Sequence, residues 1–578
     1  MDLKSRRSTY RRKRRTRSTA SIFFGLILLI GGLYWASAVW LPNSEHVDPE
    51  WLGTVNKPIF AEGERLEGSA LGEGDSLKLP LPVIQSVVDP TIRYEEETGS
   101  VILTTPQKLV FLKADEKVAQ INNKPTTLRF APEEQEGVIY LPAYLLETLY
   151  GTEVQEDEAS GAVLLVRAGD SVQTAKVLST SRKQDGTIPL RTGPSIHQPI
   201  LFDMPPAADL RLLESGEEWH YVQLNNGYTG YVQHKNVQIG ENRTVPELKQ
   251  ELSEAKKKWE AKTINMTWEA VYQVAPKPAS IGKLPGVNVV SPTWFSLVDG
   301  KGNVQSKADP AYVKWAHAQG MQVWGLFSNS FEPDITTEAL ANFENRLNTI
   351  LQMLHFVKLY DLDGINIDYE NVYTKDGDNL TQFMRELRPL AEEQGLIVSI
   401  DVTPKSSSEM WSAFLDRKAL GQVVDYLVLM AYDEHWAASP VAGSVSSLPW
   451  VQQSVSRILN EDGVPPEKMI LGIPLYTRVW TEVEKDGKVE VSSKAIGMDR
   501  AKRIIEEKEL KPVLSEETGQ NYVEYKDQDG RHRIWLEDAE SLKRRVELAK
   551  SFNLAGIATW TRSFASAEAW STLQQIGE

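Results

Sequence analysis

From about residue 263 to residue 578, short apolar runs alternate with amphipathic helical stretches, and this alternation restricts the fold more than any other feature of the chain. The helical stretches include residues 380–391 and 540–552, whose apolar side chains recur on one face. Such alternation is typical of parallel strands joined by crossover helices. The eight strand-like runs are INMTWEAVY, GVNVVSPTW, QVWGLFSN, GINIDYE, LIVSIDVTP, YLVLMAYD, MILGIPLY and AGIATW. Eight such units fit a (β/α)8 TIM barrel with insertions, so we expect residues 263–578 to adopt this fold.

One strand of the predicted barrel carries acidic residues on the side opposite to its apolar residues. Side chains alternate between the two faces of a strand. One face carries Ile365, Ile367 and Tyr369, and the other carries Asn366, Asp368 and Glu370. Buried carboxylates are costly unless function requires them, and barrel enzymes place their chemistry at the carboxyl ends of strands, where Glu370 lies. The pattern predicts a catalytic Glu370, with buried, hydrogen-bonded carboxylates and no catalysis as the alternative.

Four motifs in this region resemble those of glycoside hydrolase family 18, the chitinase-like family. Asp363–Glu370 is similar to the D-G-x-D-x-D-x-E motif, and residues 430–433 (MAYD) are similar to M-x-Y-D. Residues 472–476 (GIPLY) are similar to G-x-P-x-Y, and Trp560 is similar to the tryptophan beneath the sugar at the cleaved bond. The run AYDEHW at residues 431–436 resembles the branch of spore cortex-lytic N-acetylglucosaminidases.

The resemblance implies hydrolysis with retention, in which the N-acetyl oxygen of the substrate attacks the anomeric carbon. Glu370 would protonate the leaving oxygen and then deprotonate water, for which its pKa must be raised. Asp368 would orient the acetamide and stabilise the oxazolinium charge, and Tyr432 would hydrogen-bond the acetamide oxygen. An aromatic face such as that of Trp560 covers an apolar sugar face. The expected substrate-binding residues are Asp363, Asn366, Asp433, Met430, Trp560, Tyr476, Trp294, Phe327 and Arg478.

The chain departs from the family motif at Asn366, where the family has an aspartate that helps its neighbour exchange a proton. That neighbour is Asp368 here. An asparagine can donate a hydrogen bond to Asp368 but cannot share its charge. The same asparagine occurs in the cortex-lytic branch, so we expect Asn366 to alter the pH dependence without abolishing activity.

The N-terminus combines a basic tail with an apolar segment. Residues 1–19 have a net charge of +8, and residues 21–41 contain no charged residue, which is about the length that spans a membrane core of ~30 Å. We expect residues 1–20 to be a cytoplasmic tail and residues 21–41 an uncleaved signal-anchor, which places the remainder outside the cell membrane. One alternative is a cleaved signal peptide, because Ala36-Ser37-Ala38 resembles a cleavage site, and the protein would then be secreted. The other is a basic run for nuclear targeting or nucleic-acid binding.

Between the anchor and the barrel we expect a linker, two small β-rich domains and a connector helix. Residues 42–80 show no apolar period and are interpreted as the linker. Residues 81–168 resemble the copper amine oxidase N-terminal-like stalk domains of exported proteins from Gram-positive bacteria, although without His or Cys we expect no copper there. Residues 171–240 resemble bacterial SH3-like domains, and residues 241–262 have helical spacing.

The SH3-like resemblance depends on the last hairpin of that segment. Members of the family commonly bind cell-wall peptides, so its aromatic residues are expected either to form a peptide groove or to fill a plain β-barrel core. The residues concerned are Trp219, Tyr221, Gly227, Tyr228, Gly230 and Tyr231.

Charge and composition exclude several classes of function. The whole chain has a net charge of −16, so without its first 19 residues (+8) it carries −24, which does not suit nucleic acid as a partner. The chain has no cysteine, which excludes disulfides, thiolate metal sites and thiol nucleophiles. No His or Asp pair has convincing metal-ligand spacing, and no glycine-rich phosphate loop follows a strand, so we expect neither metal nor cofactor.

The sequence therefore predicts a membrane-anchored wall enzyme that hydrolyses β-1,4 bonds following N-acetylglucosamine in peptidoglycan or its fragments. Two alternatives remain open. One is a chitinase or endo-N-acetylglucosaminidase acting on other glycans, because the chemistry at the cleaved bond is shared. The other is a non-catalytic glycan-binding wall protein, although chitinase-like lectins typically lose the acid that Glu370 provides here.

Overall fold

The computed structural model describes residues 23–30, 32, 40–178, 186–249 and 262–578. Its internal contacts divide the chain into two compact units. The first comprises residues 1–92, 112–119 and 127–249, and the second comprises residues 93–111, 120–126 and 250–578. The predicted barrel therefore lies in the second unit.

Within the described residues 262–578, eight parallel strands form a closed barrel, as the sequence predicts. Parallel pairings run around the ring, and those of β20 with β34 and of β21 with β24 complete it. The barrel strands are β20 (Ile264–Glu269), β21 (Val289–Pro292), β24 (Gln322–Ser328), β25 (Gly364–Asp368), β26 (Ile397–Val402), β27 (Tyr426–Met430), β28 (Met469–Pro474) and β34 (Gly556–Trp560). A hairpin of β22 (Phe295–Leu297) and β23 (Val304–Ser306) follows β21.

Each strand divides its side chains between the barrel interior and the layer beneath the helices. The interior cluster includes Trp268, Trp324 and Ile397. The outer cluster includes Ile365 and Ile367. Even-numbered residues of β25 therefore face the interior, which confirms the alternation predicted for this strand.

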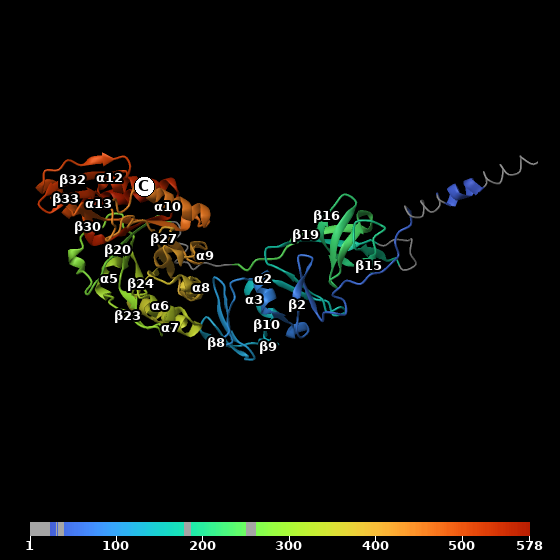
Figure 1. Ribbon diagram of the computed structural model, residues 1–578. Coiled ribbons are helices and arrows are strands. Elements are labelled where there is room, and N and C mark those ends of the chain that lie inside the picture. Colours follow the sequence, from blue (N-terminus) through green and yellow to red (C-terminus); the bar gives the residue numbers. More distant parts are fainter. Residues whose placement is uncertain (1–22, 31, 33–39, 179–185, 250–261) are drawn as a thin grey trace, which may run out of the picture. The chain divides into compact units, whose positions relative to one another are not determined.

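Helices lie around the barrel strands (Figure 1). The helix α7 begins after Asn342, whose side chain accepts a hydrogen bond from the Asn345 amide at 3.0 Å, and it ends at Asp361 in the left-handed region. The predicted helices at residues 380–391 and 540–552 correspond to α8 and α12. The helices of this unit are α5 (Pro310–Ala318), α6 (Pro333–Leu340), α7 (Phe343–Tyr360), α8 (Gly377–Glu393), α9 (Arg417–Val423), α10 (Leu448–Glu461), α11 (Met498–Glu507), α12 (Ala539–Ser551) and α13 (Ala567–Leu573).

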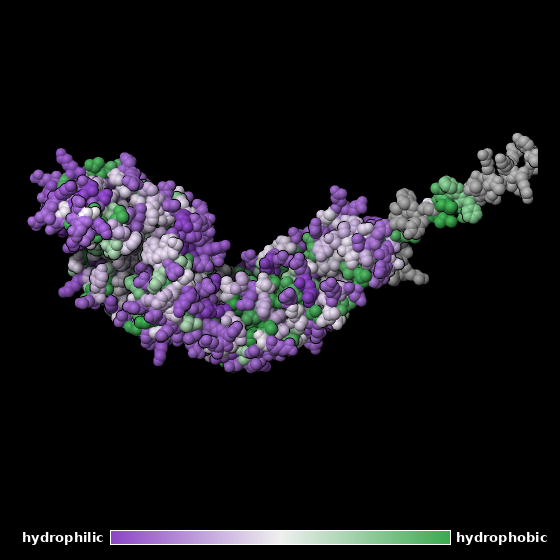
Figure 2. Space-filling view, in the orientation of Figure 1, coloured by the Kyte–Doolittle hydropathy of each residue, from purple (hydrophilic) through white to green (hydrophobic). Residues whose placement is uncertain are grey.

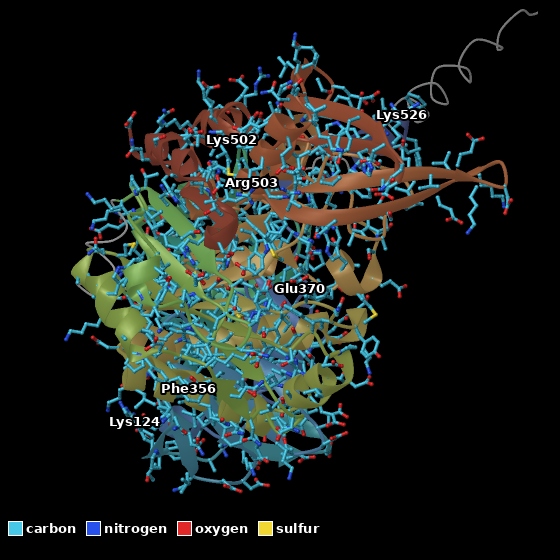
Figure 3. All side chains as sticks on the ribbon, turned by 90° about the vertical axis from the view of Figure 1, so that its left-hand side faces the viewer. Lys124, Phe356, Glu370, Lys502, Arg503 and Lys526 are labelled. Carbon is cyan, nitrogen blue, oxygen red and sulfur yellow. The ribbon has the colours of Figure 1, made fainter. Side chains whose placement is uncertain are left out.

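The largest insertion in the barrel follows β28. It forms a five-stranded sheet with its own small apolar core, to which α11 contributes Ala501 and Ile504. Figure 3 shows Lys502, Arg503 and Lys526 on these elements, next to the barrel strands around Glu370. The strands are β29 (Tyr476–Lys485), β30 (Lys488–Gly497), β31 (Val513–Ser515), β32 (Gln520–Asp527) and β33 (Gly530–Trp535).

Part of the predicted stalk domain is built into the barrel unit. Residues 93–111 and 120–126 supply most of a five-stranded sheet and belong to the second unit. The Phe111 ring stacks on Phe343 of α7 with 4.4 Å between ring centroids. Arg346 of α7 is fully buried and pairs with Glu95 at 2.7 Å and with Glu386 at 2.7 Å. The strands are β4 (Arg93–Glu95), β5 (Ser100–Thr104), β6 (Leu109–Lys113), β7 (Val118–Ile121) and β8 (Lys124–Thr127).

The first unit begins with strands where a linker was expected. Residues 42–80 are not a plain linker, because β1 pairs in parallel with β12 at the end of the stalk segment and its four residues are buried. The short PIFA run has no polar alternation, which explains why no period was visible. The elements are β1 (Pro58–Ala61), β2 (Glu64–Ser69), β3 (Lys78–Pro80), α2 (Leu81–Val87), β9 (Glu133–Gln135), β10 (Val138–Pro142), α3 (Ala143–Tyr150), β11 (Glu153–Glu156) and β12 (Val163–Val166).

The segment resembling SH3-like domains forms a seven-stranded sheet in the first unit. Tyr228 is buried in its core, whereas Tyr221 and Tyr231 are half-buried on neighbouring strands, with 4.8 Å between ring centroids. The aromatic set therefore divides between core and surface. The strands are β13 (Ser171–Val177), β14 (Ile188–Arg191), β15 (Ile200–Met204), β16 (Asp209–Ser215), β17 (Trp219–Leu224), β18 (Thr229–Gln233) and β19 (Val237–Thr244).

Two predicted helices are described only in part. Of the anchor at residues 21–41, the structure describes residues 23–30, which are helical and hydrophobic (Figure 2), with residues 32, 40 and 41. Among the described residues, no helix is both long and apolar enough to cross a membrane. The connector helix predicted at residues 241–262 is absent from residues 241–249, because β19 continues to Thr244; residues 250–261 are not described.

Candidate active site

Glu370 lies two residues after the end of β25, at the carboxyl end of the barrel strands, and Figure 3 shows it within the barrel. Its backbone is held by the side chain of Asn329, which follows β24. The Asn329 amide nitrogen donates to the Glu370 carbonyl at 2.7 Å, and the Glu370 N–H donates to the Asn329 oxygen at 3.1 Å. Asn329 is fully buried, so these two hydrogen bonds fix the backbone of Glu370 and thereby the position of its Cα atom.

Glu370 lies in a pocket of about 210 Å³ at this end of the barrel. The lining comes from the carboxyl ends of several strands, which is where barrel enzymes build their sites. It combines carboxyl, phenol and aromatic groups. The lining residues are Trp268, Phe331, Asp368, Glu370, Asp401, Thr403, Trp411, Met430, Tyr432, Asp433, Tyr476 and Trp560.

The environment of Glu370 prepares it to carry a proton at neutral pH. Burial, reinforced by the charge of Asp433, raises the pKa of Glu370 from 4.5 to about 7. Burial also raises the pKa of Asp368 well above its ordinary value, with the charges of Glu370 and Asp401 adding to the effect. A carboxyl that is protonated near neutral pH can act as a general acid.

Asn366 contacts a different carboxylate from the one expected. Its amide nitrogen donates to Asp401 Oδ1 at 2.8 Å rather than to Asp368. The Asn366 oxygen accepts from the indole N–H of Trp268 at 2.9 Å and from the Ser291 hydroxyl at 3.0 Å. Asp368 Oδ1 is buried and has no hydrogen-bond partner. The expected contact fails because donors on two other strands fix the amide with its nitrogen toward β26.

Tyr432, Asp433 and Tyr476 are three polar residues of the pocket lining. Tyr476 donates its hydroxyl to Asp433 Oδ1 at 2.6 Å, and Arg478 Nη2 lies 3.4 Å from the same oxygen. Burial raises the pKa of Tyr432 well above its ordinary value, so its phenol remains a hydrogen-bond donor. Arg478 thus reaches the site through Asp433 and is not itself part of the lining.

Five of the residues expected to bind substrate are outside the lining of the pocket. Asn366 and Arg478 contact the lining carboxylates Asp401 and Asp433, whereas the other three contact other parts of the fold. Trp294 is 1% exposed and packs edge-on against Tyr312, with 5.5 Å between ring centroids. Phe327 faces the helix layer and stacks on Phe295 at 4.3 Å, because its odd position on β24 points away from the interior residues Trp324 and Leu326.

Asp363 is the third, and it precedes β25 at the opposite end of the strand from Glu370. Its carboxylate bonds His317 Nε2 at 2.9 Å and accepts from the Val323 N–H at 2.8 Å. Its contacts are with the start of β24 and the helix before it.

Some pocket residues were not predicted from the sequence. The run LIVSIDVTP holds a detectable pattern, since Ser399, Asp401 and Thr403 alternate with apolar residues just as the polar residues of β25 do. Trp268 on β20, Phe331 in a loop and Trp411 in a short π-helix (Glu409–Ala413) carry no comparable local pattern. Among the residues that the structure describes, no group of three or more His, Cys, Asp or Glu side chains could hold a metal ion.

Comparison with known proteins connects this geometry to a family. Residues 333–565 match the model of glycosyl hydrolases family 18, and residues 61–165 match that of the copper amine oxidase N-terminal domain. The crystal structure of the C-terminal domain of a putative chitinase from Desulfitobacterium hafniense DCB-2 is 25% identical, with a TM-score of 0.50, and the match covers 55% of this chain and 100% of that one.

Two relatives come from Bacillus subtilis (strain 168). A putative sporulation-specific glycosylase is 30% identical over 293 residues, which cover 50% of this chain and 63% of the relative. A cortical fragment-lytic enzyme is 26% identical over 254 residues, 43% of this chain and 58% of the relative. The chain thus spans less than two thirds of the length of either. With these matches, the barrel carries a glycosyl hydrolases family 18 domain, and a copper amine oxidase N-terminal domain precedes it.

Proposed function

We propose that the barrel hydrolyses, with retention of configuration, β-1,4 bonds following N-acetylglucosamine in peptidoglycan or its fragments. The observation that carries the proposal is Glu370, a carboxyl of pKa about 7 at the carboxyl end of β25 inside a pocket with an aromatic wall. Such a group donates a proton to the leaving glycosidic oxygen and then accepts one from water. Asp368 and Tyr432, which line the same pocket, would hold the acetamide while its oxygen attacks the anomeric carbon.

The choice of peptidoglycan rests on the relatives and on the segments before the barrel. Two relatives are named a sporulation-specific glycosylase and a cortical fragment-lytic enzyme, which favours a bacterial wall glycan. The resemblance of residues 171–240 to SH3-like domains points the same way. Tyr221 and Tyr231, half-buried side by side, are candidates to contact wall peptides.

The test incubates the purified protein with peptidoglycan and, separately, with chitin oligosaccharides, and identifies products by mass spectrometry. Glu370→Gln is the control. New N-acetylglucosamine reducing ends from peptidoglycan that depend on Glu370 support the proposal, and preferential cleavage of chitin oligosaccharides moves the substrate to chitin. An inverted anomeric configuration, followed by proton NMR, contradicts the substrate-assisted mechanism. Binding without any Glu370-dependent product indicates a glycan-binding protein.

The cellular location is a second part of the proposal. The uncharged residues 21–41 after a tail of charge +8 favour a membrane anchor with the barrel on the outer side. Expression in a Gram-positive host, followed by membrane fractionation and protease treatment of intact cells, tests this. The anchored form remains in the membrane fraction and is cut from outside, whereas release into the medium indicates a cleaved signal peptide.

A further inference from the structure

The strand next to β25 brings another carboxylate into the pocket. β25 and β26 pair in parallel with Ile367 opposite Ile400, so the following pair along the two strands is Asp368 and Asp401. Both residues face the barrel interior and line the pocket that contains Glu370. Asp401 is 2% exposed, so its carboxyl has almost no access to solvent. Nothing in the resemblance to the family assigns this residue a role.

Asn366 connects this carboxylate to the position where the family motif has an aspartate. Its oxygen is occupied by Trp268 and Ser291, and its amide nitrogen donates to Asp401 Oδ1 at 2.8 Å. The donor, Asn366, therefore lies on β25, and the acceptor, the carboxylate of Asp401, lies on β26. Exchanging the two residues would keep the hydrogen bond and reverse its direction, with the carboxylate on β25.

We propose that Asp401, acting as a positioning residue, performs the proton exchange with Asp368 that a third carboxylate on β25 would otherwise perform. This rests on the proposed function. Before reaction, Asp368 and Asp401 share one proton. As positive charge develops on the substrate acetamide, the O–H bond at Asp368 breaks and one forms at Asp401. Asp368 is then anionic beside the charge, and the total number of protons is unchanged.

The electrostatics of the pocket agree with a shared proton. Burial and the charge of Glu370 raise the pKa of Asp401 well above its ordinary value, although hydrogen bonds from Asn366 and Trp268 oppose this. The titratable groups that face it are Asp368 at the end of β25, Glu370 after β25 and Tyr432 after β27. No lysine or arginine is among the lining residues that the structure describes, so a bound proton must reduce the repulsion between the neighbouring carboxylates.

The test compares Asp401→Asn with the exchanged double variant Asn366→Asp/Asp401→Asn. Asp401→Asn is expected to lower kcat about 100-fold or more while KM changes little, since positioned proton-transfer groups contribute at least this much. Both limbs of the pH profile should move to lower pH, because removing a like charge lowers the pKa of the remaining carboxyls. The double variant should restore kcat to within about threefold of the original protein and return both limbs of the pH profile to their original positions. Such recovery is expected when the effects of two contacting residues, here 366 and 401, are not additive.

Asp425→Asn is the matched control. Asp425 precedes β27 at the opposite end of the barrel and accepts from the Val398 N–H at 2.8 Å, so its loss should leave the pH profile in place. The double variant keeps the hydrogen bond, which keeps the test valid if Asp401→Asn does not fold. An unchanged pH profile in Asp401→Asn, or a folded double variant that remains as slow as Asp401→Asn, overturns the proposal.

Infrared titration in a Glu370→Gln background separates this proposal from the proposed function. Besides the band of Glu537, whose pKa burial raises to about 7, a further protonated carboxyl band should persist at neutral pH. Its titration should move to lower pH in Asp401→Asn, because a like charge is removed, and return in the double variant. This result holds even if no glycan is cleaved. Absence of this further band at neutral pH in the Glu370→Gln background overturns the shared proton, whatever the activity.

Discussion

Replacing Glu370 with glutamine should abolish hydrolysis and also stabilise the fold at alkaline pH. The folded pKa of Glu370 is raised to about 7 from an ordinary value of 4.5, chiefly by burial. A raised folded pKa contributes stability that is complete below the unfolded pKa and is lost as the pH rises through the folded pKa. At 1.36 kcal/mol per pKa unit, the ionised glutamate costs about 3 kcal/mol at pH 8 and less than about 1 kcal/mol at pH 5.

Glutamine has nearly the same shape and no charge, so Glu370→Gln should avoid this cost. The measurement is thermal or guanidinium unfolding of both proteins at pH 5 and pH 8, following the transition of the barrel unit. The exposed Glu506 on α11 provides the matched control, because Glu506→Gln should leave stability unchanged at either pH. Equal stability of Glu370→Gln and the original protein at pH 8 would refute the reasoning, since it would mean that Glu370 is ionised without cost.

Three further outcomes are expected. Because Glu370 must be protonated to act, kcat/KM should fall above about pH 7. Asp433→Asn should move this high-pH limb of the profile to lower pH, because it removes the charge that helps to raise the pKa of Glu370. A high-pH limb near pH 5 in the original protein would contradict this. Arg346→Met should lower the free energy of unfolding by about 3–5 kcal/mol, because it leaves buried Glu386 without its counter-charge; a loss below about 1 kcal/mol would be inconsistent. Tyr432→Phe should lower kcat about 100-fold at an unchanged unfolding temperature, as removal of one stabilising donor does, and unchanged kcat would exclude the acetamide contact.

The barrel could be predicted because its sequence determinants are local. Alternation along β25 separates Ile365 and Ile367 from the polar residues, and the structure places the two sets in the outer and inner layers. The helices α8 and α12 follow from apolar spacing in the same way. These features need only neighbours within the same element, so a single sequence contains them.

The errors arise where a contact depends on strand register or on segments distant in the sequence. Phe327 lies near the end of its strand, but its odd position turns it to the helix layer, which only the alignment of β24 with its neighbours reveals. The partner of Asn366 is Asp401 rather than Asp368 because Trp268 and Ser291, from two other strands, fix the amide. Residues 93–111 contact the barrel helices partly through the ion pair of Glu95 with the buried Arg346. Arginine is mostly exposed in proteins, so the sequence alone does not reveal this contact.

The charge of the pocket explains why its carboxyls suit acid catalysis. Four of the lining residues are carboxylic acids and, among the residues described, none of the lining side chains is a lysine or arginine. Arg478 lies at the edge and pairs with Asp433, the carboxylate whose charge raises the pKa of Glu370. A lysine or arginine beside Asp368, Glu370 and Asp401 would keep these carboxyls ionised and remove the proton that Glu370 has to donate. Protons therefore provide the neutralisation, and unlike a fixed cation they can move as charge develops on a substrate.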